Sequence, residues 1–306
     1  MIKAILDVDT GIDDALAIAL AVRHPAVQLE AVVTVAGNVS LDLTTRNTLR
    51  VLDWLGASDV PVYAGADRPL RGELRDASHW HGVDGLGGAE LPEPGRDALS
   101  NGVQNLCERV LGAPGELTLV CTAPLTNLAL AVQRERGIVQ SVREVVLMGG
   151  AARRSGNATP VAEFNIYADP DAAALVFRQA WPITMVGLDV TEQVTLTRAE
   201  RQTLTARTSP EAVLVREVTR HTFDVLGFPS MALHDPLAMA VAVQRDLVTT
   251  IHRDVSVETR GEHTLGETIV DLRSRAPKPR LNTHVCTDVD VARAKDFFFT
   301  TLFEPS

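Results

Sequence analysis

The sequence predicts an α/β protein in which a mostly parallel central sheet is flanked by helices on both faces. Short apolar runs of strand length alternate with longer stretches of helical period over the first 190 or so residues. The chain has 306 residues, and no composition shift within it marks a linker. We therefore expect one domain, residues 1–306, with helical additions in the C-terminal half.

The predicted elements follow one another mainly as strand and then helix. Buried strands are expected where apolar residues run together over strand length, at residues 4–8, 29–35, 60–63, 117–121, 142–148 and 183–188. Helices are expected where apolar residues recur at helical spacing, at residues 12–24, 41–55, 99–111, 125–136, 170–181 and 289–303. Ser40 is the expected N-cap of the second helix, and Gly56 closes it.

Five stretches do not fit this alternation. Residues 68–96 are rich in Gly, Pro and charge and are predicted to be a long loop, and residues 153–162 a second polar loop. Residues 197–245 are expected to be almost wholly helical, in several pieces, and residues 255–259 and 268–273 to form a hairpin. Long loops in compact domains usually carry function or are disordered. The glycines of residues 82–88 make the first loop a candidate lid over a substrate.

Charge and cysteine content narrow the class of protein. Lys and Arg number 29 and Asp and Glu 39, so the net charge is −10, which disfavours binding to nucleic acid. The three cysteines form no C-x-x-C pair, which favours a reducing compartment. Acid appears as early as Asp7, too soon for a signal peptide, and no apolar run reaches the length of a membrane span. We expect a cytoplasmic protein without membrane contact.

Four aspartates lie within eight residues, where the first strand meets the first helix: Asp7, Asp9, Asp13 and Asp14. Helix capping accounts for one or two acids at a helix start, but not for four that repel one another. A hard cation such as Ca²⁺ or Mg²⁺ relieves this repulsion. A metal site is therefore favoured over capping with solvated charge. Gly11 does not fit the Asp-x-Asp-x-Thr signature of phosphatases, and the EF-hand spacing is absent.

Seven segments resemble motifs of the inosine–uridine-preferring nucleoside hydrolase family, and they occur in the family's order. They are DVDTGIDDA at 7–15, VAGNV at 35–39, HGVDGLG at 81–87, TAPLTNLA at 122–129, VLMGG at 146–150, NATPVAEFN at 157–165 and HDPLA at 234–238. Any one of them is weak, but the ordered set is highly specific. The resemblance covers residues 7 to 238 and implies the family's Rossmann-like nucleoside hydrolase fold.

The resemblance also implies an activity, a cofactor and an assembly. The family hydrolyses the N-glycosidic bond of ribonucleosides, giving ribose and free base, with one bound Ca²⁺. By motif position, Asp9, Asp14 and Asp235 would supply carboxylate ligands and Thr122 a main-chain carbonyl. Asp9 would also deprotonate the attacking water, through a transition state with oxocarbenium character. The family's members form dimers and tetramers, so a homodimer or homotetramer is expected.

The remaining motif residues would contact the substrate. His234 would donate a proton to the leaving base, His81 would lie over the base or sugar, and Asp7 would support the metal site. Asn38 would lie close to the sugar, and the ribose hydroxyls would be held by the following residues: Asp13, Asn157, Glu163 and Asn165.

Several of these residues also have a purely structural interpretation. Asn157 taken alone is typical of a turn residue. Glu163 and Asn165 together are compatible with a solvated loop, and His234 with a helix cap. Trp80 fits core packing and a base-stacking face equally well.

The choice of base is open. His81 and His234 favour the non-specific or pyrimidine-preferring members, and an aromatic content of 4% argues weakly against an aromatic-walled purine pocket. Further selectivity is expected from residues 223–228. Three rival functions are a hydrolase of another ribosyl compound, a catalytically idle nucleoside-binding protein of the same fold, and a metal phosphohydrolase, which Gly11 disfavours.

Overall fold

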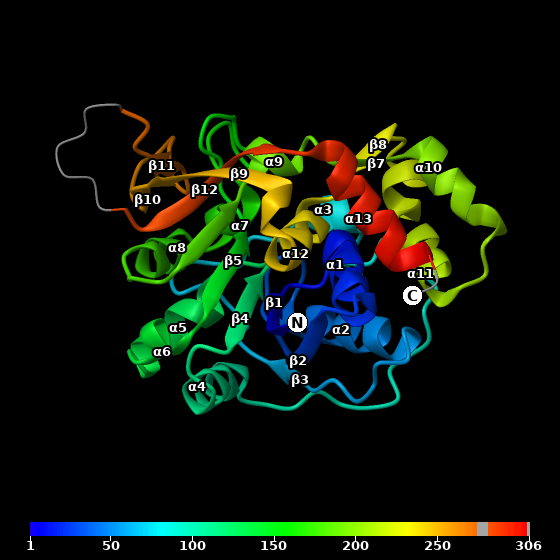
Figure 1. Cartoon of the computed structure of the whole chain (residues 1–306), viewed down its shortest axis with the longest axis horizontal. Coiled ribbons are helices and arrows are strands. Elements are labelled where there is room, and N and C mark those ends of the chain that lie inside the picture. The colour runs from blue at the N-terminus through cyan, green and yellow to red at the C-terminus, as the bar shows by residue number, and fades with distance from the viewer. Residues whose placement is uncertain (274–280, 305–306) are drawn as a thin grey trace.

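The computed structural model describes residues 1–273 and 281–304 and is shown in Figure 1. Its strands are β1 (Ile2–Val8), β2 (Val27–Thr34), β3 (Val62–Ala64), β4 (Leu117–Cys121), β5 (Glu144–Met148), β6 (Ile183–Val186), β7 (Thr195–Thr197), β8 (Ser230–Ala232), β9 (Val248–Arg253), β10 (Val255–Val257), β11 (Thr268–Val270) and β12 (Thr283–Val289). Its α-helices are α1 (Ile12–Arg23), α2 (Leu41–Trp54), α3 (Ser78–His81), α4 (Gly102–Gly112), α5 (Thr126–Arg134), α6 (Ile138–Ser141), α7 (Phe164–Ala168), α8 (Pro170–Phe177), α9 (Leu188–Thr191), α10 (Arg198–Thr203), α11 (Pro210–Val218), α12 (His234–Val243) and α13 (Val291–Phe303). Two 3₁₀ turns, η1 (Leu204–Ala206) and η3 (Arg245–Leu247), and a π-helical turn, η2 (His221–Val225), complete the set.

The main sheet has eight strands in the order β3-β2-β1-β4-β5-β6-β12-β9. Its neighbouring strands are parallel except for β9, which is antiparallel to β12, so the predicted fold class is confirmed. The first six positions follow the doubly wound order, in which the direction of strand addition reverses between β1 and β4. Ligands of such sheets bind beyond the carboxyl ends of the strands at this reversal. The topology therefore places a site next to the ends of β1 and β4.

Helices cover the two faces of the sheet as two separate groups (Figure 1). One apolar cluster joins α1, α2, α11, α12 and α13 to the sheet, and a second joins α4, α5, α6 and α8 to the opposite face. Strand β1 contributes to both, because Leu6 and Val8 belong to the first cluster and Ile5 to the second. A strand that is buried on both faces is a nearly continuous apolar run. This run is why β1 could be predicted from the sequence.

Helix α1 carries the aspartates and is itself part of the core. Nine of its twelve residues are buried, including Asp14. A helix that is apolar on most of its circumference is covered on several sides, and α1 packs against α2, α11, α12 and α13. The N-terminus of α1 is thereby held rigidly at the sheet edge.

Two predictions about the C-terminal half need correction. The stretch at 197–245 is mostly helical, but β8 interrupts it and pairs antiparallel with β7. Strands β9 and β12 were not predicted, although they extend the main sheet. Both mix exposed polar residues with apolar ones, so neither forms the continuous apolar run of a central strand. The hairpin of β10 and β11 is confirmed.

The long stretch at 68–96 is largely irregular, as predicted, apart from α3. Several contacts hold its first part against the body of the protein, two of them short hydrogen bonds. The Leu70 amide donates to Asp169 Oδ2 at 2.8 Å, and Arg75 Nη1 donates to the Tyr167 carbonyl at 2.8 Å.

None of the helices in the described ranges combines the length and apolar character needed to cross a bilayer.

Candidate active site

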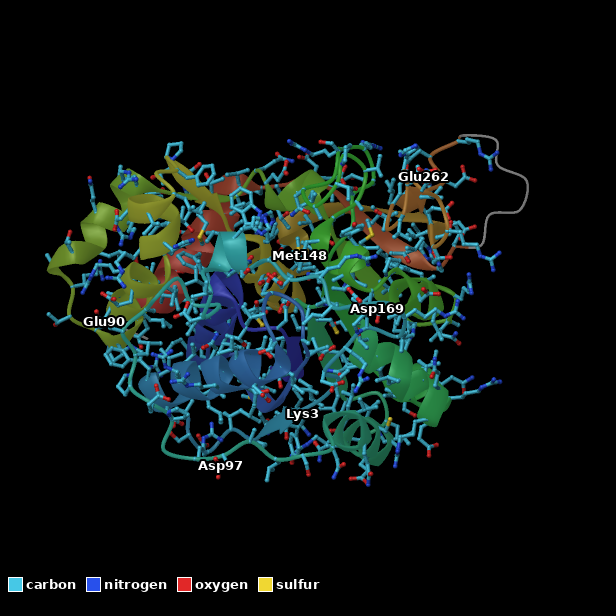
Figure 2. All side chains as sticks on the ribbon, turned by 180° about the vertical axis from the view of Figure 1, so that it is seen from behind. Lys3, Glu90, Asp97, Met148, Asp169 and Glu262 are labelled. Carbon is cyan, nitrogen blue, oxygen red and sulfur yellow. The ribbon has the colours of Figure 1, made fainter. Side chains whose placement is uncertain are left out.

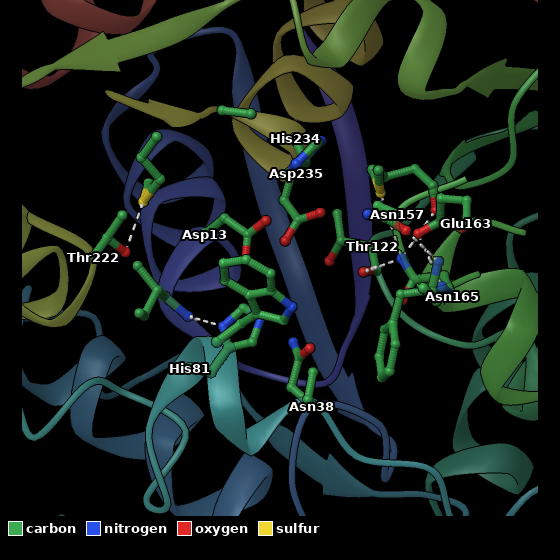
Figure 3. A pocket seen from close by; sticks show the side chains of 18 of the residues that line it. Asp13, Asn38, His81, Thr122, Asn157, Glu163, Asn165, Thr222, His234 and Asp235 are labelled. Atoms are coloured by element: carbon green, nitrogen blue, oxygen red, sulfur yellow. Dashed lines mark hydrogen bonds between the residues drawn. The ribbon is translucent and has the colours of Figure 1, made fainter. Parts of the chain in front are cut away.

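A cavity of about 570 Å³ opens at the carboxyl ends of β1, β4 and β5. In the rear view of Figure 2, Met148 at the end of β5 lies near the middle of the molecule, and Lys3 near the start of β1 lies toward its lower edge. Asp9 and Asp14 lie fully buried next to this cavity. Its lining includes the other predicted site residues, several of which Figure 3 labels: Asp13, Asn38, His81, Thr122, Asn157, Glu163, Asn165, His234 and Asp235.

Asp9 follows directly after β1 and has one oxygen free. Its Oδ2 accepts a hydrogen bond from the Asn38 amide at 2.7 Å. Its Oδ1 is buried and meets no hydrogen-bond donor among the described residues. Gly37 allows Asp9 to lie this close to the backbone before Asn38, because a Cβ at position 37 would collide with Asp9 Oδ2. A buried carboxylate oxygen without a partner is costly and points to a ligand.

Asp14, in the first turn of α1, is surrounded by donors. The Gly11 amide donates to its Oδ2 at 2.9 Å, Asn38 Nδ2 donates to the same oxygen at 3.3 Å, and Thr122 Oγ1 donates to its Oδ1 at 2.7 Å. The Thr122 hydroxyl contact was not foreseen. Together these contacts tie the end of β4 to the start of α1.

Asp13, Asp14 and Asp235 converge although more than 200 residues separate α1 from α12. Oxygen atoms of these three carboxylates lie within 4.8 Å of one another. Figure 3 shows Asp13 and Asp235 directed at the same space, with Thr122 beside Asp235. The sequence predicted Asp9 rather than Asp13 as the third acid beside Asp14 and Asp235. The structure brings Asp13 into this group, with Asp9 close behind.

Burial and mutual repulsion dominate the electrostatics of this cluster. Burial raises the pKa of Asp235 well above its usual range, and the charges of Asp13, Asp14, Asp9 and Glu163 raise it further. Burial and the neighbouring Asp14 likewise raise the pKa of Asp9. Among the described residues, the ligand atoms that converge here are carboxylate oxygens, which suit a hard divalent cation, and such a cation would favour the ionised carboxylates. The donor set therefore fits a metal ion.

Glu163 and Asn165 form a buried hydrogen-bonded unit, so the solvated-loop interpretation is wrong. Glu163 caps α7, where its Oε1 accepts from the Asn165 amide at 2.9 Å and its Oε2 from the Gly150 amide at 2.9 Å. Asn165 Nδ2 donates to the carbonyls of Thr122 at 2.9 Å and Met148 at 3.2 Å. Burial raises the pKa of Glu163, although the backbone amides oppose the shift.

The loop at 150–162 brings Asn157 to the cavity. Asn157 is exposed, and its Oδ1 accepts from the Phe164 amide at 2.9 Å, so it serves as a turn residue as well as a lining residue. Asp189 fixes the start of this loop by accepting from the amides of Ala152 at 2.6 Å and Arg153 at 2.9 Å. Sequence reasoning missed Asp189, whose only signal is an acid just after a strand.

The two predicted histidines are held through Nδ1. His81 Nδ1 accepts from the Ile12 amide at 3.0 Å, which leaves the proton of the neutral ring on Nε2. Gly11 permits this contact, since a Cβ there would lie 2.5 Å from His81 Nδ1. His234 Nδ1 lies 2.7 Å from Thr191 Oγ1. Burial lowers the pKa of both histidines.

His234 is the first residue of α12, but its ring makes no capping contact. The N-cap of this helix is Leu233, and its side chain makes no capping hydrogen bond. The helix-cap interpretation of His234 is therefore wrong.

Asp7, the predicted supporting residue, is buried near the end of β1 and does not line the cavity. Its Oδ1 accepts from Asn127 Nδ2 at 2.7 Å, and Asn127 Oδ1 accepts from the Ala66 amide at 2.9 Å. Burial raises the pKa of Asp7 to about 7. These bonds join β1, α5 and the segment after β3.

We call the buried part of the cavity the deep wall and the opposite, more exposed part the outer wall. The deep wall comprises the lining residues Asp13, which is half-buried, and Asn38, Thr122, Glu163, Asn165 and Asp235, together with the buried Asp9 and Asp14 next to them. The outer wall comprises Arg75, Trp80, Tyr167, Thr222, Phe228 and Met231.

The outer wall is aromatic despite the low aromatic content of the chain. The rings of Trp80 and Phe228 lie 5.5 Å apart and are 47% and 37% exposed. Trp80 therefore does not pack in the core. Of the region expected to add selectivity, Phe228 lines the cavity, whereas Phe223 is fully buried and does not line it. Sequence reasoning missed Arg75, Thr222 and Met231, which lie outside any motif.

Comparison with known proteins agrees with this geometry. The family model described as inosine-uridine preferring nucleoside hydrolase matches residues 4–296. An inosine-uridine preferring nucleoside hydrolase of Leishmania major is 41% identical, over 94% of this chain and 93% of its own. A pyrimidine-specific ribonucleoside hydrolase RihA of Photobacterium profundum is 40% identical, over 94% of both chains.

A solved structure shares the fold as well. The purine-preferring ribonucleoside hydrolase from Gardnerella vaginalis superimposes with a TM-score of 0.90 at 36% identity, over 98% of both chains. Fold, site and sequence agree, and the chain belongs to the inosine-uridine preferring nucleoside hydrolase family.

Proposed function

We propose that the chain hydrolyses the N-glycosidic bond of ribonucleosides to ribose and free base, in a Ca²⁺-dependent reaction. The observation that carries this proposal is the convergence of Asp13, Asp14 and Asp235 within 4.8 Å. They meet in a cavity of about 570 Å³, which is also lined by His81 and His234 and is of a size typical of small-molecule sites. Membership of a family of nucleoside hydrolases supports the reaction class.

The cation would be held by Asp9, Asp14, Asp235 and the Thr122 carbonyl. That carbonyl accepts one hydrogen bond from Asn165, and a second lone pair remains for a ligand. A bound Ca²⁺ supplies positive charge that makes a neighbouring water more acidic and fixes its place.

Asp9 would accept the proton of the attacking water. Its Oδ2 is engaged by the Asn38 amide, and its Oδ1 is the oxygen free to take that proton. The engaged oxygen fixes the orientation of the carboxylate, so the free oxygen has a defined direction.

The ribose hydroxyls would be held by Asp13, Asn157, Glu163 and Asn165, with Asn38 close to the sugar. Glu163 and Asn165 are locked by bonds to backbone groups, so they need not reorganise when a sugar binds. Rigid holding of the ribose lowers the entropic part of the barrier as C1′ acquires oxocarbenium character.

His234 would protonate the leaving base, and His81 would lie over the base or sugar. Both have Nδ1 occupied, so Nε2 is the ring atom available to a substrate. A base leaves more readily when it is protonated as the bond breaks.

We propose a non-specific or pyrimidine-preferring enzyme. The two imidazoles support this choice, as does the 40% identity to a pyrimidine-specific relative. The aromatic outer wall and the purine-preferring structural neighbour favour the non-specific alternative, because every nucleobase has a face that can stack.

The test is release of ribose from uridine, cytidine, inosine, adenosine and nicotinamide riboside, with and without Ca²⁺. Turnover of uridine or cytidine that stops after chelation supports the proposal. Selective turnover of nicotinamide riboside would replace it with the hydrolysis of another ribosyl compound. Absence of turnover on the whole panel would contradict it. Analytical ultracentrifugation tests the expected homodimer or homotetramer.

A further inference from the structure

The contact between His234 and Thr191 has no part in the motifs that indicate the function. Thr191 is the last residue of α9, and its Oγ1 lies 2.7 Å from His234 Nδ1. Thr191 is completely buried, whereas His234 reaches the cavity. A buried side chain therefore holds one edge of the imidazole, and the opposite edge is left for a substrate.

Thr191 is itself firmly placed. Its amide donates to the Gly187 carbonyl at 3.1 Å, and its carbonyl accepts from the Val194 amide at 3.2 Å. The Val194 carbonyl accepts from the amide of Leu233 at 2.8 Å, directly before His234. One backbone bond, between Leu233 and Val194, thus joins the segment after α9 to the residue before α12, beside the side-chain contact of Thr191 with His234.

We infer that Thr191 is a positioning residue for the reaction: its hydroxyl fixes the rotamer of His234 so that Nε2 faces the leaving base. The inference rests on the proposed acid role of His234. Without this bond the imidazole keeps its place at the start of α12 but loses the partner that sets its ring orientation. A ring that samples other rotamers reaches the base in only a fraction of encounters.

Thr191→Val tests this inference because it removes the hydroxyl and nearly preserves the volume. We expect kcat on uridine to fall roughly tenfold, in line with the loss of one oriented hydrogen bond. KM should stay within about twofold, since Thr191 does not reach the cavity. Turnover of p-nitrophenyl riboside should be unchanged, because its leaving group departs without a proton. Thr191→Ser should restore uridine turnover.

Two controls separate positioning from packing. Thr118→Val removes another fully buried hydroxyl, which contacts Glu144 on β5 away from the carboxyl edge, and it should leave both substrates unaffected. In a His234→Ala background, Thr191→Val should cause no further loss on uridine. If Thr191→Val does not fold, Thr191→Ala provides the same comparison.

The outcomes distinguish this inference from the proposed function. If His234→Ala loses uridine turnover selectively but Thr191→Val retains it, the positioning role is overturned and the acid role stands. Equal losses on uridine and p-nitrophenyl riboside in Thr191→Val would mean that the threonine is merely structural. If His234→Ala itself shows no selective loss, the acid role fails, and the inference fails with it.

Discussion

The deep and outer walls of the cavity are built in different ways. The deep wall consists of side chains at strand ends and helix starts, nearly all buried, and most are held by hydrogen bonds to backbone groups. The outer wall comes from short elements and the irregular segments beside them: Trp80 lies in α3, Tyr167 in α7, Thr222 in η2 and Met231 in β8, and Trp80 and Phe228 are partly exposed. One wall is fixed by the central sheet, and the other depends on short peripheral elements and loops.

This difference matches a division of labour under the proposed function. Every ribonucleoside presents the same ribose, so the wall that handles the sugar and the cation can be rigid. The base differs between nucleosides, so the residues that face it can differ between relatives. The outer wall is where such substitutions disturb the rest of the site least. The chain accordingly resembles relatives whose names differ in base preference. The predictions below test this contrast, from the largest expected effect to the smallest.

Asp9→Ala should lower kcat roughly a thousandfold or more on every nucleoside, because it removes the proposed general base. The fold should persist, as circular dichroism will show. Asp97→Ala is the matched control, since Asp97 is exposed and lies at the periphery in Figure 2. Near-native turnover by Asp9→Ala would remove Asp9 from the base role.

Removal of the cation should stop turnover and lower the melting temperature by about 5 °C or more, because a ligand that binds only the native state stabilises it. Calorimetry before and after exhaustive chelation measures this shift. Restoration by Ca²⁺ completes the test. If activity and melting temperature both survive chelation, no metal is required.

His234→Ala should lower kcat on uridine by roughly a hundredfold and affect p-nitrophenyl riboside little, because only the nucleobase needs a proton. Steady-state rates on both substrates give the comparison. An equal loss on both would argue against the acid role.

Trp80→Ala should change the outer wall alone. Loss of one stacking ring is expected to raise KM for nucleosides by roughly tenfold and to alter the ratio between bases, with kcat changed much less. Val83→Ala is the control on the same loop, because Val83 is 87% exposed and does not line the cavity. A fall in kcat that is equal for all bases would contradict the division between the walls.

Arg75→Ala should have the smallest effect, a few-fold increase in KM. Arg75 donates to the Tyr167 carbonyl and lies over the Tyr167 ring at 4.5 Å, so its loss loosens the segment before α3 without touching the deep wall. Limited proteolysis should cut near residues 68–77 faster than in the wild type. Unchanged proteolysis would show that the Leu70–Asp169 contact suffices.

The sequence was informative where chemistry and topology coincide. Asp9 and Thr122 lie directly after apolar strands, so parallel pairing brings them to one edge. The partners that orient the site were less visible. Thr191 contacts His234, and Asp189 holds the 150–162 loop. Both contacts depend on tertiary packing, which no local sequence pattern encodes.

The same limit applied to the fold. The central strands are buried on both faces and were recognised as apolar runs. Strands β9 and β12 have a mixed pattern, in which exposed polar residues stand among buried or half-buried ones. The outer wall was hidden for a related reason. The aromatic content of 4% is an average over the whole chain. It does not reveal that several of the aromatic residues lie at one cavity.

Strand β12 has a consequence for how the molecule is made. It lies between β6 and β9, and Thr283 pairs with Ile183, 100 residues earlier in the chain. During synthesis, the strands up to β6 emerge first and can assemble, but the free edge of β6 stays uncovered until residues 283–289 leave the ribosome. An open strand edge attracts other chains. Growing chains should therefore depend on chaperones late in translation, and stop codons placed before β12 should yield aggregates rather than a smaller working enzyme.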